Sequence, residues 1–268
     1  MTESTGGLHV RETGAGRPIL FLHGWSCHGG FFADANAGLA DRFHCLAPDL
    51  PGHGLTGTDG PALSIEAAAD ACAALLAERD LSNVVLVGWS MGVHVAYAVI
   101  ERHGRARISA LASLDMTPKI VNDGSWTLGI SGGFDEGRNR LAQRLMRTDW
   151  TTYAGALTQN MFADGVSPTD AKTAALLDDV RANDPEAMVA MWDSLAQQDF
   201  RALQPTLDLP VLLIHGAKSR IYDLAVGRHQ VAQFPRAELE IFKQSGHSPH
   251  LEEPEAFIRL LGDFAARV

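Results

Sequence analysis

The sequence predicts an α/β protein built around a mostly parallel central sheet. Three short runs, at 19–22, 84–87 and 211–214, are continuously apolar and bounded by turn residues. Such runs are typical of strands buried on both faces of a parallel sheet. Segments of helical period lie between them, and a chain of 268 residues is long enough to bury one large core with an insertion. We therefore expect a single sheet flanked by helices.

The other elements follow in chain order. Weaker strand-like runs occupy residues 43–47, 108–114 and 239–242. Residues 67–76 place Ala, Cys and Leu at i, i+4 and i+8, which predicts a helix with one apolar stripe. Residues 90–100 are apolar nearly all round, as a buried helix should be. A last helix is expected from Pro254, whose apolar face would consist of Phe257, Leu260, Leu261 and Phe264.

The alternation of strand and helix stops between residues 117 and 207. This stretch has helical periodicity and is rich in large apolar side chains, among them Trp126, Phe134, Trp150, Tyr153, Phe162, Met188 and Trp192. We expect a helical cap at 117–207, inserted into a core made of residues 1–116 and 208–268. Its aromatic side chains either form the interior of the cap or wall an apolar cleft, and the sequence leaves both open.

Charge and composition exclude several classes of protein. The net charge is −10 and the Lys and Arg residues are scattered, which argues against a nucleic-acid partner. The chain shows no secretory pattern at its start and no run of about 18 apolar residues, so we expect no membrane partner. Three widely separated cysteines, Cys27, Cys45 and Cys72, indicate a reduced, cytoplasmic protein. The sequence leaves open whether the protein is a monomer or a homodimer.

The segment Gly88-Trp89-Ser90-Met91-Gly92 follows one predicted strand and opens the predicted buried helix. A Gly-x-Ser-x-Gly sequence in this context predicts a strained turn that exposes the serine hydroxyl as a nucleophile. The amino terminus of the helix favours negative charge there. The alternative is a chance pentapeptide in which Ser90 only caps the helix.

A loop that ends the first buried strand, His23-Gly24-Trp25, could complete an oxyanion hole. The backbone amides of Trp25 and Met91 would together bind the carbonyl oxygen of a substrate. The other interpretation is that the His23 and Trp25 side chains only pack under the loop.

A general base is expected at His247, in the segment between the strand-like run 239–242 and the last helix. A serine hydroxyl needs such a base because it is almost fully protonated at neutral pH. His250 is a local competitor. A metal site built on these two histidines lacks a third ligand at suitable spacing, so no metal is expected.

These motifs, in this order, resemble the α/β-hydrolase superfamily. The resemblance covers nearly the whole chain and includes the segments at 23–25, 49–54, 88–92 and 246–254. Within the superfamily, the elbow and the His-Gly-Trp loop are similar to pimeloyl-acyl-carrier-protein methyl ester esterases and related carboxylesterases. The resemblance implies ester hydrolysis but not that particular substrate, with Ser90 as nucleophile, His247 as base and the amides of Trp25 and Met91 as oxyanion donors. No phosphate-binding loop is present in the sequence, and we expect no cofactor.

The sequence departs from these relatives at the third member of the triad. They usually carry Asp three residues after the Gly that ends the penultimate strand, and this chain has Ser219 there. A carboxylate is needed to fix the imidazole tautomer and to stabilise the imidazolium. We expect Asp115, at the end of the strand 108–114, to supply it, as in some other members of the superfamily. Asp223 is the reserve, although we expect it inside the following helix.

The sequence thus predicts a serine hydrolase that cleaves an ester, lactone or thioester of a small to medium hydrophobic substrate. Two alternatives remain. A cofactor-independent dioxygenase of the quinolone-cleaving kind would use a His247/Asp115 dyad on the same fold. A non-enzymatic ligand-binding protein could retain the scaffold without the chemistry.

Overall fold

The structure, a computed structural model, describes residues 2–5, 7–163 and 171–268. Within these residues, eight strands form one sheet in the order β1-β2-β4-β3-β5-β6-β7-β8. The pairings from β4 to β8 are parallel, whereas β1 and β2 join the edge in antiparallel fashion. The strands are β1 (Thr2–Thr5), β2 (Leu8–Thr13), β3 (Arg17–Leu22), β4 (Phe43–Pro48), β5 (Val84–Trp89), β6 (Ile108–Leu114), β7 (Val211–Gly216) and β8 (Ala237–Phe242).

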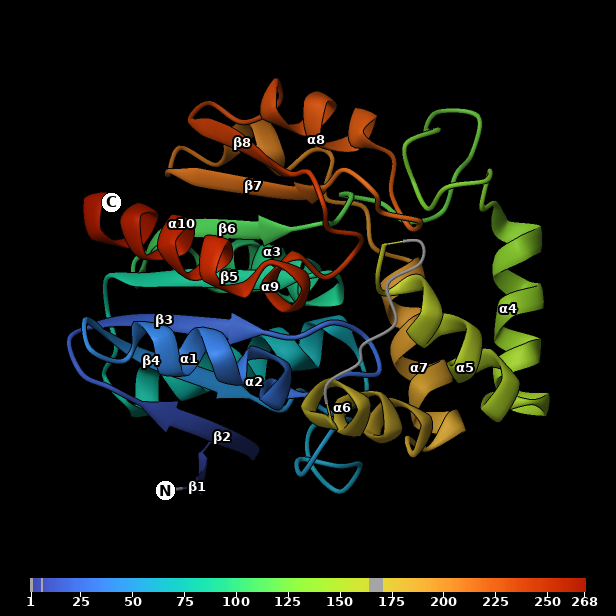
Figure 1. Ribbon diagram of the computed structural model, residues 1–268, viewed down its shortest axis with the longest axis horizontal. Coiled ribbons are helices and arrows are strands. Elements are labelled where there is room, and N and C mark those ends of the chain that lie inside the picture. The colour runs from blue at the N-terminus through green and yellow to red at the C-terminus, as the bar shows by residue number, and fades with distance from the viewer. Residues whose placement is uncertain (1, 6, 164–170) are drawn as a thin grey trace.

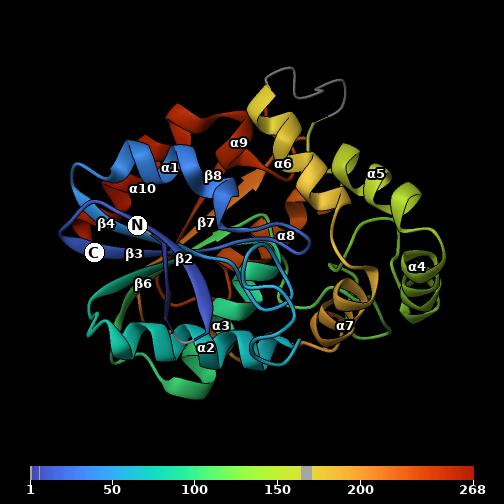
Figure 2. The same ribbon diagram turned by 90° about the horizontal axis from the view of Figure 1, so that it is seen from below.

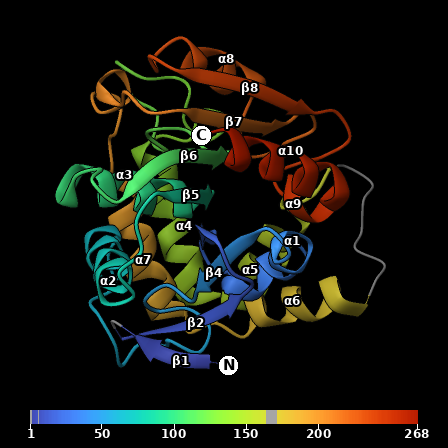
Figure 3. The same cartoon turned by 90° about the vertical axis from the view of Figure 1, so that its left-hand side faces the viewer.

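Helices cover both faces of the sheet (Figures 1 and 3). One face carries α1 (Ala33–Leu39) and α10 (Pro254–Arg267), and the other carries α2 (Ile65–Glu78), α3 (Met91–His103) and α8 (Leu224–Val231). Successive residues of the central strands point to opposite faces, so each strand contributes to both cores. In β3, for example, Leu20 packs into one core and Phe21 into the other. This explains the continuously apolar runs.

The predicted fold class is confirmed, and the predicted strands are present with small changes at their ends. The apolar pattern of the sequence does not predict β1 or β2. Only alternate residues of β2, Leu8 and Val10, are fully buried, because this strand lies near the edge of the sheet. A half-buried strand of six residues gives a much weaker apolar signal than the central strands.

Between β6 and β7 the described chain forms four α-helices, which we call the cap helices: α4 (Glu136–Thr148), α5 (Trp150–Asn160), α6 (Ala171–Arg181) and α7 (Pro185–Ala196). They lie beyond the carboxyl ends of the parallel strands, at the right in Figure 1 and also at the right in Figure 2. Aspartate side chains begin three of them, since Asp135, Asp149 and Asp184 each accept a hydrogen bond from a backbone N–H in the first turn. No helix in the described ranges is both long and apolar enough to cross a bilayer.

Candidate active site

Ser90 lies at a sharp turn between β5 and α3. Its backbone has φ 52° and ψ −122°, in a region that L-residues rarely adopt. The two flanking glycines allow this turn because the backbone of neighbouring segments passes against them. A Cβ on Gly92 would lie 2.0 Å from the carbonyl oxygen of Leu22, and one on Gly88 would lie 2.5 Å from the amide nitrogen of Val93. The local sequence therefore forms the strained elbow that the motif predicts.

The structure brings His247 and Asp115 together. Asp115 follows β6 with a φ of 42°, and His247 lies in the loop between β8 and the short helix α9 (Pro249–Glu252). The distance from His247 Nδ1 to Asp115 Oδ2 is 2.7 Å. An ionised carboxylate can only accept a hydrogen bond, so Nδ1 carries the hydrogen and Nε2 of the neutral ring keeps its lone pair. This tautomer is the one that a general base requires.

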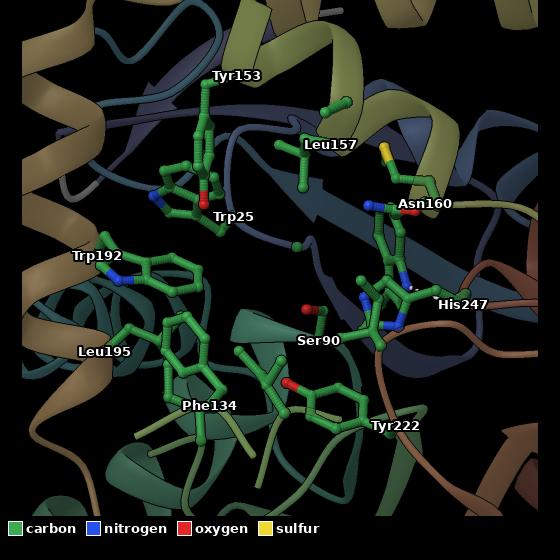
Figure 4. A pocket seen from close by; sticks show the side chains of 17 residues that line it. Trp25, Ser90, Phe134, Tyr153, Leu157, Asn160, Trp192, Leu195, Tyr222 and His247 are labelled. Carbon is green, nitrogen blue, oxygen red and sulfur yellow. Dashed lines mark hydrogen bonds between the residues drawn. The ribbon is translucent and has the colours of Figure 1, made fainter. Parts of the chain in front are cut away.

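The elbow also holds the histidine loop in place. The indole Nε1 of Trp89 donates a hydrogen bond of 2.8 Å to the carbonyl oxygen of His247. Ser90 and His247 both line the same pocket, and Figure 4 shows them at its edge, with Trp192 on the opposite side. Ser90 and His247 are therefore held by contacts at the carboxyl ends of β5, β6 and β8.

Asp115 is completely buried, and both of its oxygens have partners. Besides His247, Oδ2 accepts a hydrogen bond of 2.6 Å from the hydroxyl of Ser219, and Oδ1 accepts one of 3.3 Å from the amide of Gly216. The Nδ1 atom of His215 lies 3.1 Å from Oδ1. Burial alone would raise the pKa of Asp115, but the imidazoles of His215 and His247 outweigh it and hold the pKa well below its usual range. The carboxylate stays ionised.

The competing residues lie elsewhere. The expectation that Asp223 lies inside α8 is wrong. Asp223 precedes the first residue of that helix, is exposed, and accepts a hydrogen bond from the amide of Ala225. His250 is buried among aromatic rings, with centroid distances of 4.7 Å to Phe32 and 4.5 Å to Trp89. Burial lowers the pKa of His250 to about 3, so its ring is neutral. No group of three potential metal ligands occurs among the residues that the structure describes.

The loop after β3 passes directly beside the elbow. A Cβ on Gly24 would lie 3.3 Å from Cβ of Ser90. In the part of the chain that the structure describes, the backbone amides of Trp25 and Met91 have no acceptor. The imidazole of His23 shapes this loop, since it accepts a hydrogen bond from the amide of Leu50 and its other nitrogen lies 2.8 Å from the carbonyl oxygen of Gly24. The loop leaves these two amides available next to Ser90.

The Trp25 side chain connects this loop to the cap helices. Its Nε1 donates a hydrogen bond of 2.9 Å to the carbonyl oxygen of Met188 in α7. Its ring packs edge-on against Trp192, Trp150 and Tyr153, with centroid distances of 4.9, 5.8 and 6.3 Å. The Trp25 side chain therefore packs against the cap helices, whereas the backbone amide of Trp25 remains available to a ligand.

The pocket above Ser90 has a volume of about 200 Å³ and is mostly apolar (Figure 4). No Asp, Glu, Lys or Arg is among the described residues that line it. The hydroxyl of Tyr222 donates to the sulfur of Met116, 3.0 Å away, so it is already satisfied. The lining residues are Gly24, Trp25, Trp89, Ser90, Ile120, Ile130, Phe134, Tyr153, Ala156, Leu157, Asn160, Met161, Trp192, Leu195, Ile221, Tyr222 and His247.

Comparison with known proteins assigns the family. The model of the alpha/beta hydrolase family matches residues 19–260. The chain belongs to this family. A pimeloyl-[acyl-carrier protein] methyl ester esterase of Chromobacterium violaceum is 32% identical over 256 residues, which cover 96% of this chain and 97% of that protein. An enzyme of the same name from Vibrio cholerae is 28% identical over 97% of this chain and 98% of its own.

A solved esterase structure has the same fold as this chain. An esterase from Exiguobacterium antarcticum matches with a TM-score of 0.90 and 19% identity, over 99% of each chain. The family match and the curated relatives confirm the resemblance inferred from the motifs, and the chain is an ester-hydrolysing enzyme of this family.

The motifs of the sequence do not indicate the contacts of several residues at this site. The sequence shows only that Ser219 is not an aspartate, whereas in the structure its hydroxyl donates to the carboxylate of Asp115. Asn160 and Tyr222 line the pocket without belonging to any motif. A search for polar residues three positions after β7 could have found Ser219. For Asn160, at the end of α5, the sequence carries no comparable signal.

Proposed function

We propose that this hydrolase cleaves carboxylic esters of small to medium, uncharged hydrophobic acids through an acyl-enzyme on Ser90. One observation carries the proposal. The 2.7 Å hydrogen bond between His247 and Asp115 fixes the base in its reactive tautomer, in a pocket that also contains the strained serine. The curated relatives, which are named as methyl ester esterases, support the reaction class.

In the proposed mechanism, Ser90 Oγ attacks the carbonyl carbon while Nε2 of His247 takes its proton. The tetrahedral oxyanion is bound by the amides of Trp25 and Met91. Its collapse releases the alcohol, which takes the proton back from His247. A water molecule, deprotonated by His247, then attacks the acyl carbon, and collapse of this second intermediate releases the acid while Ser90 Oγ takes the proton back from His247. Asp115 remains ionised throughout and stabilises the imidazolium.

The pocket supports a limited class of acyl groups. Its volume of about 200 Å³ is below the usual range of ligand sites, which favours short to medium acyl chains. Since none of its described lining residues carries a permanent charge, an acyl group with a free carboxylate would be desolvated without a partner. The names of the relatives refer to a pimeloyl group. A diester of pimelic acid, which carries no charge, is therefore a suitable test substrate.

A series of para-nitrophenyl esters from two to twelve carbons tests the proposal. We expect turnover that is greatest for short to medium chains and that is lost in Ser90→Ala. A half-ester of a dicarboxylic acid should be a poorer substrate than the neutral diester of the same length. Equal turnover by wild type and Ser90→Ala would contradict the proposal.

The dioxygenase alternative shares the His247/Asp115 pair, so the same proteins should be tested for oxygen uptake with a 3-hydroxy-4-quinolone. Such an enzyme needs the dyad and no serine nucleophile, and Ser90→Ala would then stay active. Oxygen uptake without ester hydrolysis would favour this alternative. The ester proposal expects none in any variant.

We further propose a cytoplasmic location. Cys27, Cys45 and Cys72 are free and buried, and burial raises the pKa of Cys45 and of Cys72 to about 12. Thiols of this kind are structural and unreactive. Fractionation of the producing cells tests the location.

A further inference from the structure

Glu252 lies outside the triad and connects the two segments that meet at the pocket. Its Oε1 accepts a hydrogen bond of 2.8 Å from the amide of Ala163, which follows the cap helix α5. Its Oε2 accepts one of 2.7 Å from the amide of Gly246 and one of 3.3 Å from that of Ser248. Gly246 and Ser248 are the two neighbours of His247 in the chain.

We propose that Glu252 is a positioning residue that fixes one wall of the pocket against the loop of the catalytic histidine. This inference rests on the ester hydrolysis proposed above. It differs from that proposal because it assigns a role to a carboxylate that touches neither the substrate nor the reacting atoms.

The backbones of the two segments are in close contact at this point. A Cβ on Gly246 would lie 2.5 Å from the amide nitrogen of Ala163 and 2.5 Å from the carbonyl carbon of Phe162. Glycine at 246 therefore allows the chain after α5 to pack directly on the histidine loop. The Glu252 carboxylate then ties these two backbones together, one oxygen to each.

Each end of this link is next to a group that the reaction uses. Asn160 and Met161 lie just before Ala163 and line the pocket, while His247 lies between the two residues bound by Oε2. Hydrogen bonds to an ionised carboxylate are roughly twice as strong as neutral ones. A shift of the pocket wall is thus transmitted to the imidazole, and loss of the link should affect both acyl selection and turnover.

Glu253 provides a matched control on the same loop. Its Oε2 accepts hydrogen bonds from the hydroxyl of Ser245, at 2.6 Å, and from the amide of Gln244, at 3.2 Å. Both of these partners belong to the histidine loop, and neither belongs to the cap. Glu253→Gln therefore perturbs the loop to a similar degree without touching the link to α5.

The experiment compares wild type, Glu252→Gln and Glu253→Gln with the ester series. Glutamine retains one oxygen acceptor and presents an NH₂ group to the other segment. We expect kcat/KM of Glu252→Gln to fall roughly tenfold, as for one lost hydrogen bond to a charged group. We also expect a changed ratio of short-chain to long-chain turnover, which a change of melting temperature alone would not produce, with no change of that ratio in Glu253→Gln.

The same chain-length ratio in both variants, or a loss of melting temperature alone, would overturn the inference. Amide hydrogen exchange of the wild type gives a second test that needs no variant. The amides of Ala163 and Gly246 should both be protected from exchange, since each donates to an oxygen of the Glu252 carboxylate. Exchange of Ala163 alone at an unprotected rate would refute the link, and absence of ester turnover in wild type would refute only the proposed reaction.

Discussion

At the scale of single residues, the carboxylate that we propose as the triad acid has more partners than His247. Asp115 Oδ2 lies between His247 and Ser219, and the Ser219 oxygen is itself 3.3 Å from the amides of Ile221 and Tyr222. Because the oxygen of Ser219 accepts from those amides, its single proton is directed to the carboxylate. Ser219 thus donates its proton to the carboxylate that we propose as the triad acid.

Replacement of Asp115 by Asn should lower kcat by about three to four orders of magnitude and leave the fold intact, because asparagine stabilises the wrong imidazole tautomer. Steady-state kinetics with the best ester of the series, with circular dichroism as control, measures this effect. Activity within tenfold of wild type would exclude Asp115 as the acid.

Ser219→Ala should have a much smaller effect, a roughly tenfold loss of kcat with little change of KM. It removes one hydrogen bond to a buried carboxylate, which is worth about 1.5 to 3 kcal/mol, and leaves the charge in place. Ser219→Thr keeps the hydroxyl and should recover most of the lost activity. A Thr variant as impaired as the Ala variant would argue against the hydroxyl as the cause.

At the scale of secondary structure, the elbow depends on glycines at contacts between backbones. Gly92→Ala would place a Cβ 2.0 Å from the Leu22 carbonyl oxygen, so we expect a loss of stability of about 3 kcal/mol or more. Gly155, in the middle of α5, is the contrasting case, since a Cβ there has no atom within 4 Å. Gly155→Ala should stabilise the protein by about 0.5 to 1 kcal/mol. Urea unfolding of both variants tests the contrast, and tolerance of Gly92→Ala would contradict it.

The sequence predicted those elements whose signal is local. The elbow is a pentapeptide between a strand and a helix, and His247 follows a short strand-like run, so Ser90 and His247 could both be proposed from spacing. Asp115 required a further step, because it follows β6 and His247 follows β8, so their meeting depends on β6, β7 and β8 being consecutive in the sheet. Once that order is assumed, a carboxylate at the carboxyl end of β6 lies at the same edge of the sheet as the loop after β8.

The cap wall of the pocket could not be predicted in the same way. The rotation of each cap helix is set by contacts with other segments, and the periodicity does not decide which face meets the pocket. In α4, Leu141 and Leu145 are 53% and 45% exposed although the spacing of four suggests a buried stripe. Asn160 lines the pocket because α5 ends beside it. The position of that helix end relative to the pocket depends on tertiary packing and cannot be predicted from the sequence of α5.

At the scale of the whole molecule, several buried histidines make stability depend on pH. Burial lowers the pKa of His250 to about 3 and the pKa values of His53 and His94 to about 4. Below about pH 6.5 the unfolded chain binds protons that the folded protein does not, so stability falls as the pH falls towards 4. Each such histidine contributes about 1.4 kcal/mol per pH unit in this window.

His250→Phe tests this account, because phenylalanine can retain the ring contacts with Phe32 and Trp89 and cannot be protonated. Between pH 6.5 and 4.5 the variant should lose about 2 to 3 kcal/mol less stability than wild type. Urea unfolding at both pH values measures the difference. Parallel pH profiles for the two proteins would show that His250 is already protonated when folded.

The central claim is that Ser90 carries an acyl group during turnover. The most direct measurement is rapid mixing of the enzyme with the para-nitrophenyl ester that it hydrolyses best, followed by intact mass spectrometry of the quenched protein. We predict a burst of nitrophenolate close to one equivalent and a mass increase equal to the acyl group on the peptide that contains Ser90, both absent from Ser90→Ala. Ester hydrolysis with no burst and no adduct, or an adduct that persists in Ser90→Ala, would contradict the account.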